Sequence, residues 1–158
     1  MAGWMVLDPA AGVTLTLEAT AEGVSQISFG NAGPPPGPPG GDSLVHEAAR
    51  QLEEYFAGRR RVFDLPLDLR GTVFQRRVWS ELLKIPFGET RTYAEVARAI
   101  GAPRAVRAVG AANGANPVPI VVPCHRVVAT GGGLGGYRGG LQLKRRLLEM
   151  ELCFNVAR

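Results

Sequence analysis

The sequence has very few of the residues that bind metals or form disulfides. Its 158 residues include two cysteines, Cys124 and Cys153, and two histidines, His46 and His125. No C-x-x-C pair or other cluster of cysteine and histidine occurs, which excludes the usual zinc sites. We therefore predict a protein without a metal or other cofactor, whose thiols stay free in a reducing compartment.

Long hydrophobic runs are also absent. No apolar segment approaches the roughly 20 residues that cross a bilayer, and the N-terminus lacks a charged region followed by a hydrophobic core. We expect a cytoplasmic protein with no membrane partner. Hydrophobic residues make up 46% of the chain and charged residues 20%, as in ordinary globular proteins. The net charge of +4 and the pI near 9.6 favour a polyanionic partner.

Residues 1–68 are predicted to form a small α/β domain with a supporting role. Weak alternation of apolar and polar residues up to residue 30 indicates half-buried antiparallel strands. Residues 31–41 are almost all glycine and proline, which is typical of a loop. Helical spacing of apolar residues predicts a helix over Leu44–Phe56, and Arg59–Leu67 is expected to add a further strand.

Residues 69–158 are predicted to form a mainly helical domain. Two capping boxes, T-V-F-Q at 72–75 and T-Y-A-E at 92–95, each indicate the start of a helix. Pro103 is expected at the first position of a further helix over 104–113. Two short helices joined by a glycine turn are typical of a helix-turn-helix.

The helix predicted over 104–113 contains almost no large side chains. Alanine and valine fill most of it, and its internal Gly110 costs about 1 kcal/mol relative to alanine. An ordinary helix fits the major groove of DNA but not the roughly 6 Å minor groove. A helix of small residues can approach a bent, widened duplex closely. Tight packing in a core explains the composition equally well, so both interpretations stay open at this point.

The segment P-V-P-I-V-V-P-C-H-R-V-V at 117–128 places a cysteine and a histidine side by side. Its apolar, β-branched residues predict a short buried strand that delivers Cys124 and His125 to a surface. A thiol reacts as its thiolate, and His125 and Arg126 are candidates to lower its pKa. In a continuous strand Cys124 and His125 would point to opposite faces, so either the chain turns at Pro123 or a water relays the proton. A buried structural cysteine and a core histidine are the alternative interpretation.

Two features follow the cysteine. Seven glycines between residues 130 and 140 predict a loop that moves or brings its backbone against a ligand, without the spacing of a phosphate-binding loop. The helix predicted over Leu141–Leu152 carries Glu151 on its apolar arc. An inward carboxylate needs a partner, and the candidates are His125, as an orienting acid would require, and Lys144.

The string P-C-H-R-V, preceded by N-P-V-P-I, resembles the active-site signature of the O6-alkylguanine-DNA alkyltransferases, the methylated-DNA–protein-cysteine methyltransferases. The resemblance covers about residues 71–152. It implies an α+β fold with a ribonuclease H-like N-terminal domain and a winged-helix-like C-terminal domain. It also implies a monomer that binds double-stranded DNA containing O6-alkylguanine. In that family the cysteine irreversibly takes the alkyl group, from guanine and possibly from O4 of thymine, so each molecule repairs one base.

The resemblance assigns catalytic roles to five residues. Cys124 is the nucleophile, His125 removes its proton through a water, and Glu151 fixes the histidine tautomer. Tyr93 donates a proton towards N3 of the leaving guanine. Asn116 is the hinge asparagine between the small-residue helix and the cysteine segment.

The resemblance also implies contacts with the flipped base and with DNA. Arg107 fills the space that the base leaves, and the carbonyls of Cys124 and Val127 read its exocyclic amine. Arg138, where the family often has a small residue, offers its backbone N–H to O6 and could narrow the alkyl pocket. Two further residues, Pro119 and Tyr137, line that pocket. The expected DNA contacts are Thr92, Arg104, Ala105, Arg107, Ala108 and Asn113.

Two other functions remain compatible with these residues. The first is a non-catalytic DNA-binding protein that recognises alkylated bases, although relatives of that kind lack the cysteine. The second is a cysteine hydrolase that uses Cys124, His125 and an acid for repeated turnover.

Overall fold

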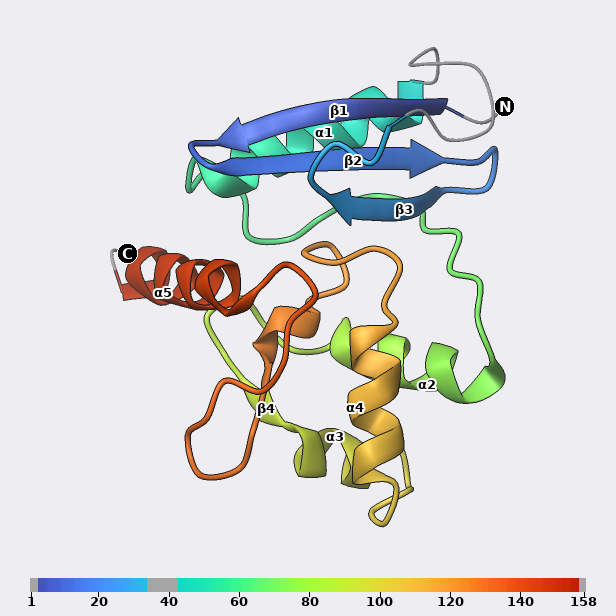
Figure 1. Ribbon diagram of the computed structural model, residues 1–158, viewed down its shortest axis with the longest axis vertical. Coiled ribbons are helices and arrows are strands. Elements are labelled where there is room, and N and C mark those ends of the chain that lie inside the picture. Colours follow the sequence, from blue (N-terminus) through green and yellow to red (C-terminus); the bar gives the residue numbers. More distant parts are fainter. Residues whose placement is uncertain (1–2, 34–42, 157–158) are drawn as a thin grey trace. The chain divides into compact units, whose positions relative to one another are not determined.

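The computed structural model of the chain describes residues 3–33 and 43–156. The chain divides into two compact units, 1–70 and 71–158, two residues after the boundary expected from the sequence (Figure 1). Most of the glycine- and proline-rich loop expected at 31–41 lies outside the described residues.

The N-terminal unit contains a three-stranded antiparallel sheet in the order β1-β2-β3. The strands are β1 (Gly3–Ala10), β2 (Val13–Ala19) and β3 (Val24–Phe29). One helix, α1 (Ser43–Phe56), packs across one face of this sheet (Figure 1). Leu15, Leu17 and Ile27 are buried between them, so the alternating pattern correctly predicted half-buried strands.

The strand predicted over Arg59–Leu67 does not form. Only Leu67 makes a bridge, in parallel with Val24. The Gln51 side chain on α1 instead bonds the backbone of Asp64, accepting from its N–H and donating to its carbonyl at 2.9 Å each. The Gln51 side chain thus makes the backbone hydrogen bonds that a neighbouring strand would make. Residues 59–67 therefore cross the unit as an irregular connection.

The C-terminal unit is mainly helical, as predicted. Its helices are α2 (Val73–Leu82), α3 (Tyr93–Ala99), α4 (Val106–Gly114) and α5 (Leu141–Val156), and its short 3₁₀ turn is η1 (Cys124–Arg126). Both capping boxes form. The hydroxyls of Thr72 and Thr92 accept from the backbone N–H three residues on, and the side chains of Gln75 and Glu95 accept in return from the backbone N–H of the two threonines.

Two contacts position the reactive turn within this unit. The short strands β4 (Arg91–Thr92) and β5 (Val127–Val128) pair in parallel, which brings the start of α3 beside the residues that follow Cys124. The Trp79 indole N–H on α2 donates to the Ala112 carbonyl of α4 at 2.8 Å. Trp79 is 1% exposed, so this bond ties α4 to the core of the unit.

The structure corrects the start of the small-residue helix. α4 begins at Val106, with Ala105 as its N-cap, rather than at Arg104. Pro103 lies in the turn before the helix and not at its first position. The Ala105 N–H donates to the Ala102 carbonyl at 2.9 Å. Residues 102–105 therefore form a turn, although the sequence predicted that the helix would already begin within them.

The strand predicted before Cys124 is also wrong, although its burial is correct. Residues 117–122 form a buried irregular segment with one isolated bridge, between Pro119 and Val122. Prolines lack the backbone N–H groups that the hydrogen bonds of a β-sheet need. The Asn116 side chain instead bonds the backbone of this segment, at Val122 and Val118. Ile120 has φ = 74°, a rare conformation for a β-branched residue.

Candidate active site

Cys124 begins the 3₁₀ turn immediately after Pro123. It is 5% exposed, and its backbone N–H donates to the Val122 carbonyl at 2.8 Å. The chain therefore turns at Pro123 and does not continue as a strand through Cys124 and His125. Burial raises the pKa of the Cys124 thiol, so the sulfur is protonated at neutral pH and needs a base to become a nucleophile.

Three side chains act against this effect of burial. A hydrogen bond from Asn116 and the positive charges of Lys144 and Arg138 each lower the pKa of the Cys124 thiol. Two of the three, Lys144 and Arg138, come from the glycine-rich loop and the helix that follows it.

His125, Arg126 and Glu151 form a buried cluster beside the thiol. His125 Nε2 lies 2.7 Å from Glu151 Oε2, so His125 is the partner that the inward position of Glu151 predicted. Arg126 donates to both carboxylate oxygens, from Nε at 2.9 Å and from Nη2 at 3.0 Å. The Gly88 backbone N–H adds a fourth bond at 3.2 Å, so the carboxylate is satisfied on both oxygens.

The charges in this cluster determine the histidine tautomer. Burial opposes ionisation of Glu151, but bonds from His125 and Arg126 hold its pKa well below the usual range. Burial lowers the pKa of His125, so its ring is neutral at pH 7. A carboxylate only accepts, so Nε2 carries the ring proton and Nδ1 is an acceptor. Nδ1 has no hydrogen-bond partner within the described part of the chain, so it is the ring nitrogen available to accept a proton.

Sequence reasoning missed the role of Arg126. We expected it to lower the pKa of the thiol, but its guanidinium group binds Glu151 and the Ile85 carbonyl, the latter at 2.8 Å. The available signal was Glu151 itself, because a buried carboxylate accepts more bonds than one imidazole can donate.

Lys144, the competing partner for Glu151, does not pair with it. Its Nζ donates to the Val127 carbonyl at 2.6 Å and to the Gly136 carbonyl at 3.1 Å. The side chain is fully buried on α5.

Two asparagines hold the backbone around the thiol. Asn116 donates to the Val122 carbonyl at 2.8 Å and accepts from the Val118 N–H at 3.0 Å, which fits the predicted hinge between α4 and the cysteine segment. Asn113 was expected to contact DNA. It is 4% exposed, however, and its amide donates to the Cys124 carbonyl at 3.3 Å, so its place in the structure does not support a DNA contact.

Tyr93 and the glycine-rich loop lie against each other. Burial raises the pKa of the Tyr93 phenol, which therefore keeps its proton at neutral pH. A Cβ on Gly135 would lie 2.5 Å from Tyr93 Oη, and Gly135 has φ = +73°, so glycine is required there. Of the expected pocket residues, Pro119 and Val127 are buried, and burial raises the pKa of Tyr137 well above its ordinary value.

Some of the residues predicted to contact DNA have exposed side chains, and others have side chains that form hydrogen bonds within the protein. Arg104, Arg107 and Ala108 are exposed at or before the first turn of α4, and Ala105 is partly exposed. The Thr92 hydroxyl is used in the cap of α3. The exposed Arg138 side chain donates to the Gly114 carbonyl at 2.5 Å, at the end of α4, which indicates that it spans from the loop to the helix.

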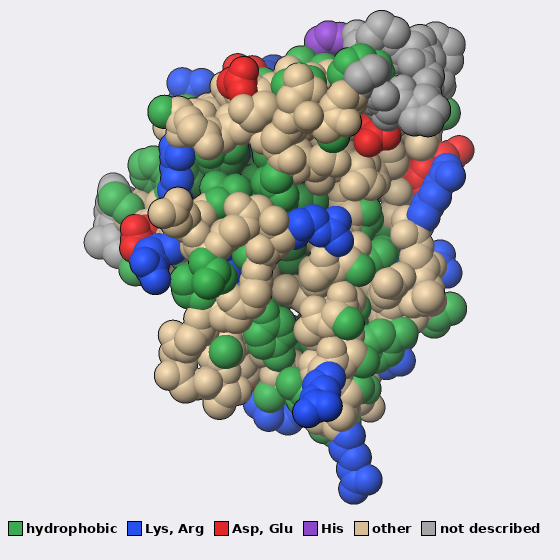
Figure 2. All heavy atoms as spheres, in the orientation of Figure 1, with side chains coloured by type: hydrophobic (Ala, Val, Ile, Leu, Met, Phe, Trp, Pro, Cys, Tyr) green, Lys and Arg blue, Asp and Glu red, His purple; other side chains and the backbone are tan. Residues whose placement is uncertain are grey.

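Positive charge belongs to the C-terminal unit. Of the 18 basic and 14 acidic residues, 13 basic and 5 acidic ones lie in residues 71–158, so this unit has a formal charge of +8 and the N-terminal unit −4. Figure 2 shows Lys and Arg side chains gathered at the end of the C-terminal unit where α3 and α4 are joined. This charge is placed to attract a polyanion to the helix-turn-helix.

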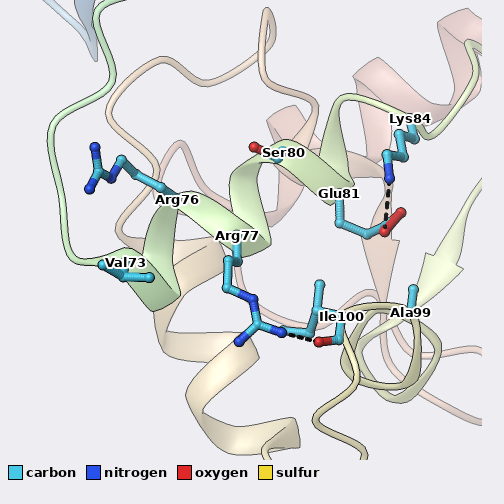
Figure 3. A pocket seen from close by; sticks show the side chains of 8 residues that line it. All are labelled: Val73, Arg76, Arg77, Ser80, Glu81, Lys84, Ala99 and Ile100. Atoms are coloured by element: carbon cyan, nitrogen blue, oxygen red, sulfur yellow. Dashed lines mark hydrogen bonds and ion pairs between the residues drawn. The ribbon is translucent and has the colours of Figure 1, made fainter.

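A groove between α2 and the end of α3 is a separate feature of this unit (Figure 3). Arg77 crosses it to bond the Ile100 carbonyl, and Lys84 pairs with Glu81 at 3.5 Å. No thiol or imidazole lines the groove, so the reactive cluster lies elsewhere.

The chain matches two family profiles. The profile described as "6-O-methylguanine DNA methyltransferase, DNA binding domain" matches residues 73–153. The profile described as "6-O-methylguanine DNA methyltransferase, ribonuclease-like domain" matches residues 40–69. The first includes the whole reactive cluster.

Individual relatives agree with these profiles. The chain is 62% identical over 104 residues to the methylated-DNA–protein-cysteine methyltransferase of Mycobacterium tuberculosis, which covers 66% of this chain and 63% of that protein. It is 54% identical over 106 residues to the constitutive methylated-DNA–protein-cysteine methyltransferase of Bacillus subtilis, covering 66% and 64% respectively. These matches therefore span less than two thirds of the relatives' length.

The solved structures confirm the α+β fold over more of the chain. The crystal structure of Mycobacterium tuberculosis OGT in complex with DNA has a TM-score of 0.86 and 45% sequence identity, covering 97% of this chain and 93% of that one. Within residues 3–33 and 43–156, no helix is long and apolar enough to cross a membrane.

Proposed function

This chain belongs to the O6-methylguanine DNA methyltransferase family, and from that premise we propose that it repairs double-stranded DNA by taking an alkyl group from O6 of guanine onto Cys124. The transfer is irreversible, so each molecule acts once, as a monomer in the cytoplasm. The observation that carries the proposal is the buried thiol beside His125, whose Nδ1 is unpartnered among the described residues while its Nε2 is bound to Glu151. This arrangement can ionise a sulfur that burial otherwise keeps protonated.

Repair begins with extrusion of the alkylated base. O6 of guanine is hidden in the base stack, so the nucleotide must rotate into a protein pocket before the sulfur can reach it. The small residues of α4 allow close approach to the minor groove. Arg107, which is exposed on this helix, fills the space left by the base, and Tyr93 helps to displace the nucleotide.

The transfer step moves one methyl group and two protons. The Cys124 proton passes through a water to His125 Nδ1, while Glu151 stabilises the resulting imidazolium and Arg126 holds the Glu151 carboxylate in place. The sulfur forms a bond to the methyl carbon as the bond from that carbon to O6 breaks. Tyr93 protonates N3 of the departing guanine, so the base leaves neutral, and the phenol later regains a proton.

Recognition of guanine uses backbone groups. The carbonyls of Cys124 and Val127 accept from the exocyclic amine, and the Arg138 N–H donates to O6. Pro119 and Tyr137 complete the pocket around the alkyl group. The Arg138 side chain itself extends to the Gly114 carbonyl at the end of α4.

Intact-mass and peptide mass spectrometry after incubation with an oligonucleotide containing O6-methylguanine tests this function. We expect Cys124 to gain the mass of one methylene group, with one equivalent of DNA repaired per protein. Cys124→Ser should show neither change. An unmodified Cys124 beside unrepaired DNA would reject the proposal, and repeated turnover on an ester would support a hydrolase instead.

The role of Arg107 is tested by comparing two substrates. Arg107→Ala should slow repair in duplex DNA much more than reaction with free O6-benzylguanine, because the free base needs no extrusion. Equal losses on both substrates would contradict a role in holding the base out of the helix.

A further inference from the structure

Lys144 is a buried cation without a carboxylate partner among the described residues. Its side chain has no exposed surface, and no ion pair within residues 3–33 and 43–156 includes it. Burying an uncompensated ammonium group is costly. The residue was one of two candidates to neutralise Glu151, but that carboxylate binds His125 and Arg126 instead. The mechanism described above gives Lys144 no role.

The ammonium group joins three parts of the proposed site. It donates to the carbonyl of Val127, which directly follows η1, and to the carbonyl of Gly136 in the glycine-rich loop. It also lies 6.0 Å from the centre of the Tyr93 ring at the start of α3, within the range of a cation–π contact. One side chain thus joins the start of β5, the glycine-rich loop and the start of α3.

The same charge acts on the thiol. The Lys144 cation lowers the pKa of Cys124, and a Cys124 thiolate raises the pKa of Lys144. Burial nevertheless lowers the pKa of Lys144 to about 8. The ammonium form is therefore present at neutral pH and is lost just above it. The other titratable and charged groups around the thiol are His125, Arg126, Arg138, Tyr93, Tyr137 and the Glu151 carboxylate.

We propose that Lys144 is a positioning residue of the alkyl-transfer site, whose buried ammonium group fixes the Val127 and Gly136 carbonyls and favours the thiolate form of Cys124. The role of Lys144 in DNA repair rests on the proposed function, whereas the effect of Lys144 on the Cys124 sulfur does not depend on that function. The reactive state contains both the thiolate and the ammonium group. The population of this state rises with pH only until Lys144 loses its proton, and then becomes constant.

This behaviour predicts a distinctive pH profile. The rate of Cys124 methylation by methyl iodide, measured by peptide mass spectrometry from about pH 6 to about pH 10, should rise and then level off near pH 8. The reaction replaces iodide with the sulfur and needs no DNA. Cys153 is exposed and provides an internal control, since its profile should not change in any Lys144 variant.

Three variants separate charge from structure. Lys144→Gln keeps an N–H donor but removes the charge, so Cys124 methylation at pH 7 should fall by roughly tenfold or more, and its rate should keep rising through pH 9. Lys144→Arg keeps a charge that does not titrate in this range, so the rate at pH 7 should recover and the plateau near pH 8 should vanish. Arg145→Gln, an exposed neighbour on the same helix, should match the unmodified chain.

The outcomes distinguish this inference from the proposed function. An unchanged Cys124 profile in folded Lys144→Gln would overturn the inference, even if repair of DNA were impaired. If the variants do not fold, a wild-type profile that rises through pH 9 without levelling off would overturn it equally. Failure of the wild type to take a methyl group from DNA, with the predicted methyl iodide profiles, would reject the repair function and leave the role of Lys144 intact.

Discussion

Glu151 is the residue on which most of the buried charge in the C-terminal unit depends. It is 1% exposed and accepts from His125, from two nitrogens of Arg126 and from the Gly88 backbone. A guanidinium group buried in this way is tolerated only while the carboxylate is present. The carboxylate therefore serves the fold as well as the histidine.

Removing this charge should affect both stability and chemistry. We expect Glu151→Gln to lower the free energy of unfolding by about 3–5 kcal/mol, because Arg126 loses its counter-ion in a buried site. Single-turnover methyl transfer should slow as well, since the histidine loses its orienting acid. Glu149→Gln, an exposed position on the same helix, should stay within about 0.5 kcal/mol of the wild type in urea titrations. Similar stabilities for the two variants would contradict the buried ion pair.

The same carboxylate predicts a loss of stability in acid. Its pKa in the folded chain lies well below the ordinary value of 4.5, so the unfolded state binds a proton first as the pH falls. The stabilisation from Glu151 is therefore fully present above about pH 4.5 and decreases as the pH drops towards the folded pKa. Urea titrations at several pH values should show the stability gap between wild type and Glu151→Gln narrowing below pH 4.5. A constant gap would contradict the depressed pKa.

At the residue scale, the sequence predicted the His125–Glu151 pair but not the other bonds to the carboxylate. Helical periodicity, which is a local property, placed Glu151 on the inward arc, and the need of a base for an orienting acid favoured His125 over Lys144 as its partner. Arg126 and Gly88 come from segments that only the tertiary fold brings to the carboxylate. The burial of Asn113 was hidden for the same reason, since its side chain points from α4 to the Cys124 carbonyl.

At the scale of the elements, the glycine-rich loop after β5 is closely constrained at Gly135 but not at Gly136. At Gly135 the backbone has a positive φ and passes against the Tyr93 hydroxyl, whereas a Cβ added to Gly136 would meet no heavy atom within 4 Å. Two adjacent glycines thus differ in what they permit, and the loop cannot be treated as a uniform flexible segment.

These two glycines give a matched test. Gly135→Ala should destabilise the unit by about 1–2 kcal/mol, because alanine is strained at positive φ, and should displace Tyr93. Methyl transfer from DNA should slow with it. Gly136→Ala has open space and an ordinary φ, so its thermal unfolding and its transfer rate should stay close to those of the wild type. Equal effects at both positions would contradict the close approach of the loop to Tyr93.

Element prediction succeeded where the signal was local. The two capping boxes placed α2 and α3 correctly, because both bonds of each box lie within four residues. It failed where side chains from other segments replaced the expected pairing. Gln51 takes the place of a strand partner at Asp64, and Asn116 does so for the segment before Cys124. Neither of these side-chain contacts can be recognised from the hydrophobic periodicity of the segment that it bonds.

At the scale of the whole molecule, charge separates the two units. The formal charges of +8 and −4 combine into the modest +4 that the sequence showed, so the total conceals the contrast. A polyanion is attracted to one unit and repelled by the other. The resemblance located the DNA-binding half, but composition of the full chain could not.

The salt dependence of DNA binding should reflect this division. We expect Arg104→Gln to reduce the slope of log K against log salt by about one, because one phosphate contact and its released counter-ion are lost. Arg59→Gln removes an exposed charge from the N-terminal unit and should leave the slope unchanged. Fluorescence anisotropy of a labelled duplex between about 50 and about 200 mM salt would measure both. A comparable change for Arg59→Gln would contradict the confinement of DNA contacts to the C-terminal unit.

The bond between Trp79 and α4 gives the chain an intrinsic optical probe. Each unit contains one of the two tryptophans, Trp4 and Trp79, and the Trp79 indole is bonded to a carbonyl of the helix proposed to enter DNA. With Trp4 replaced by phenylalanine, the emission of a single indole would report strain in α4 as a duplex bends around it. Docking of the helix could then be timed separately from the methyl transfer that follows.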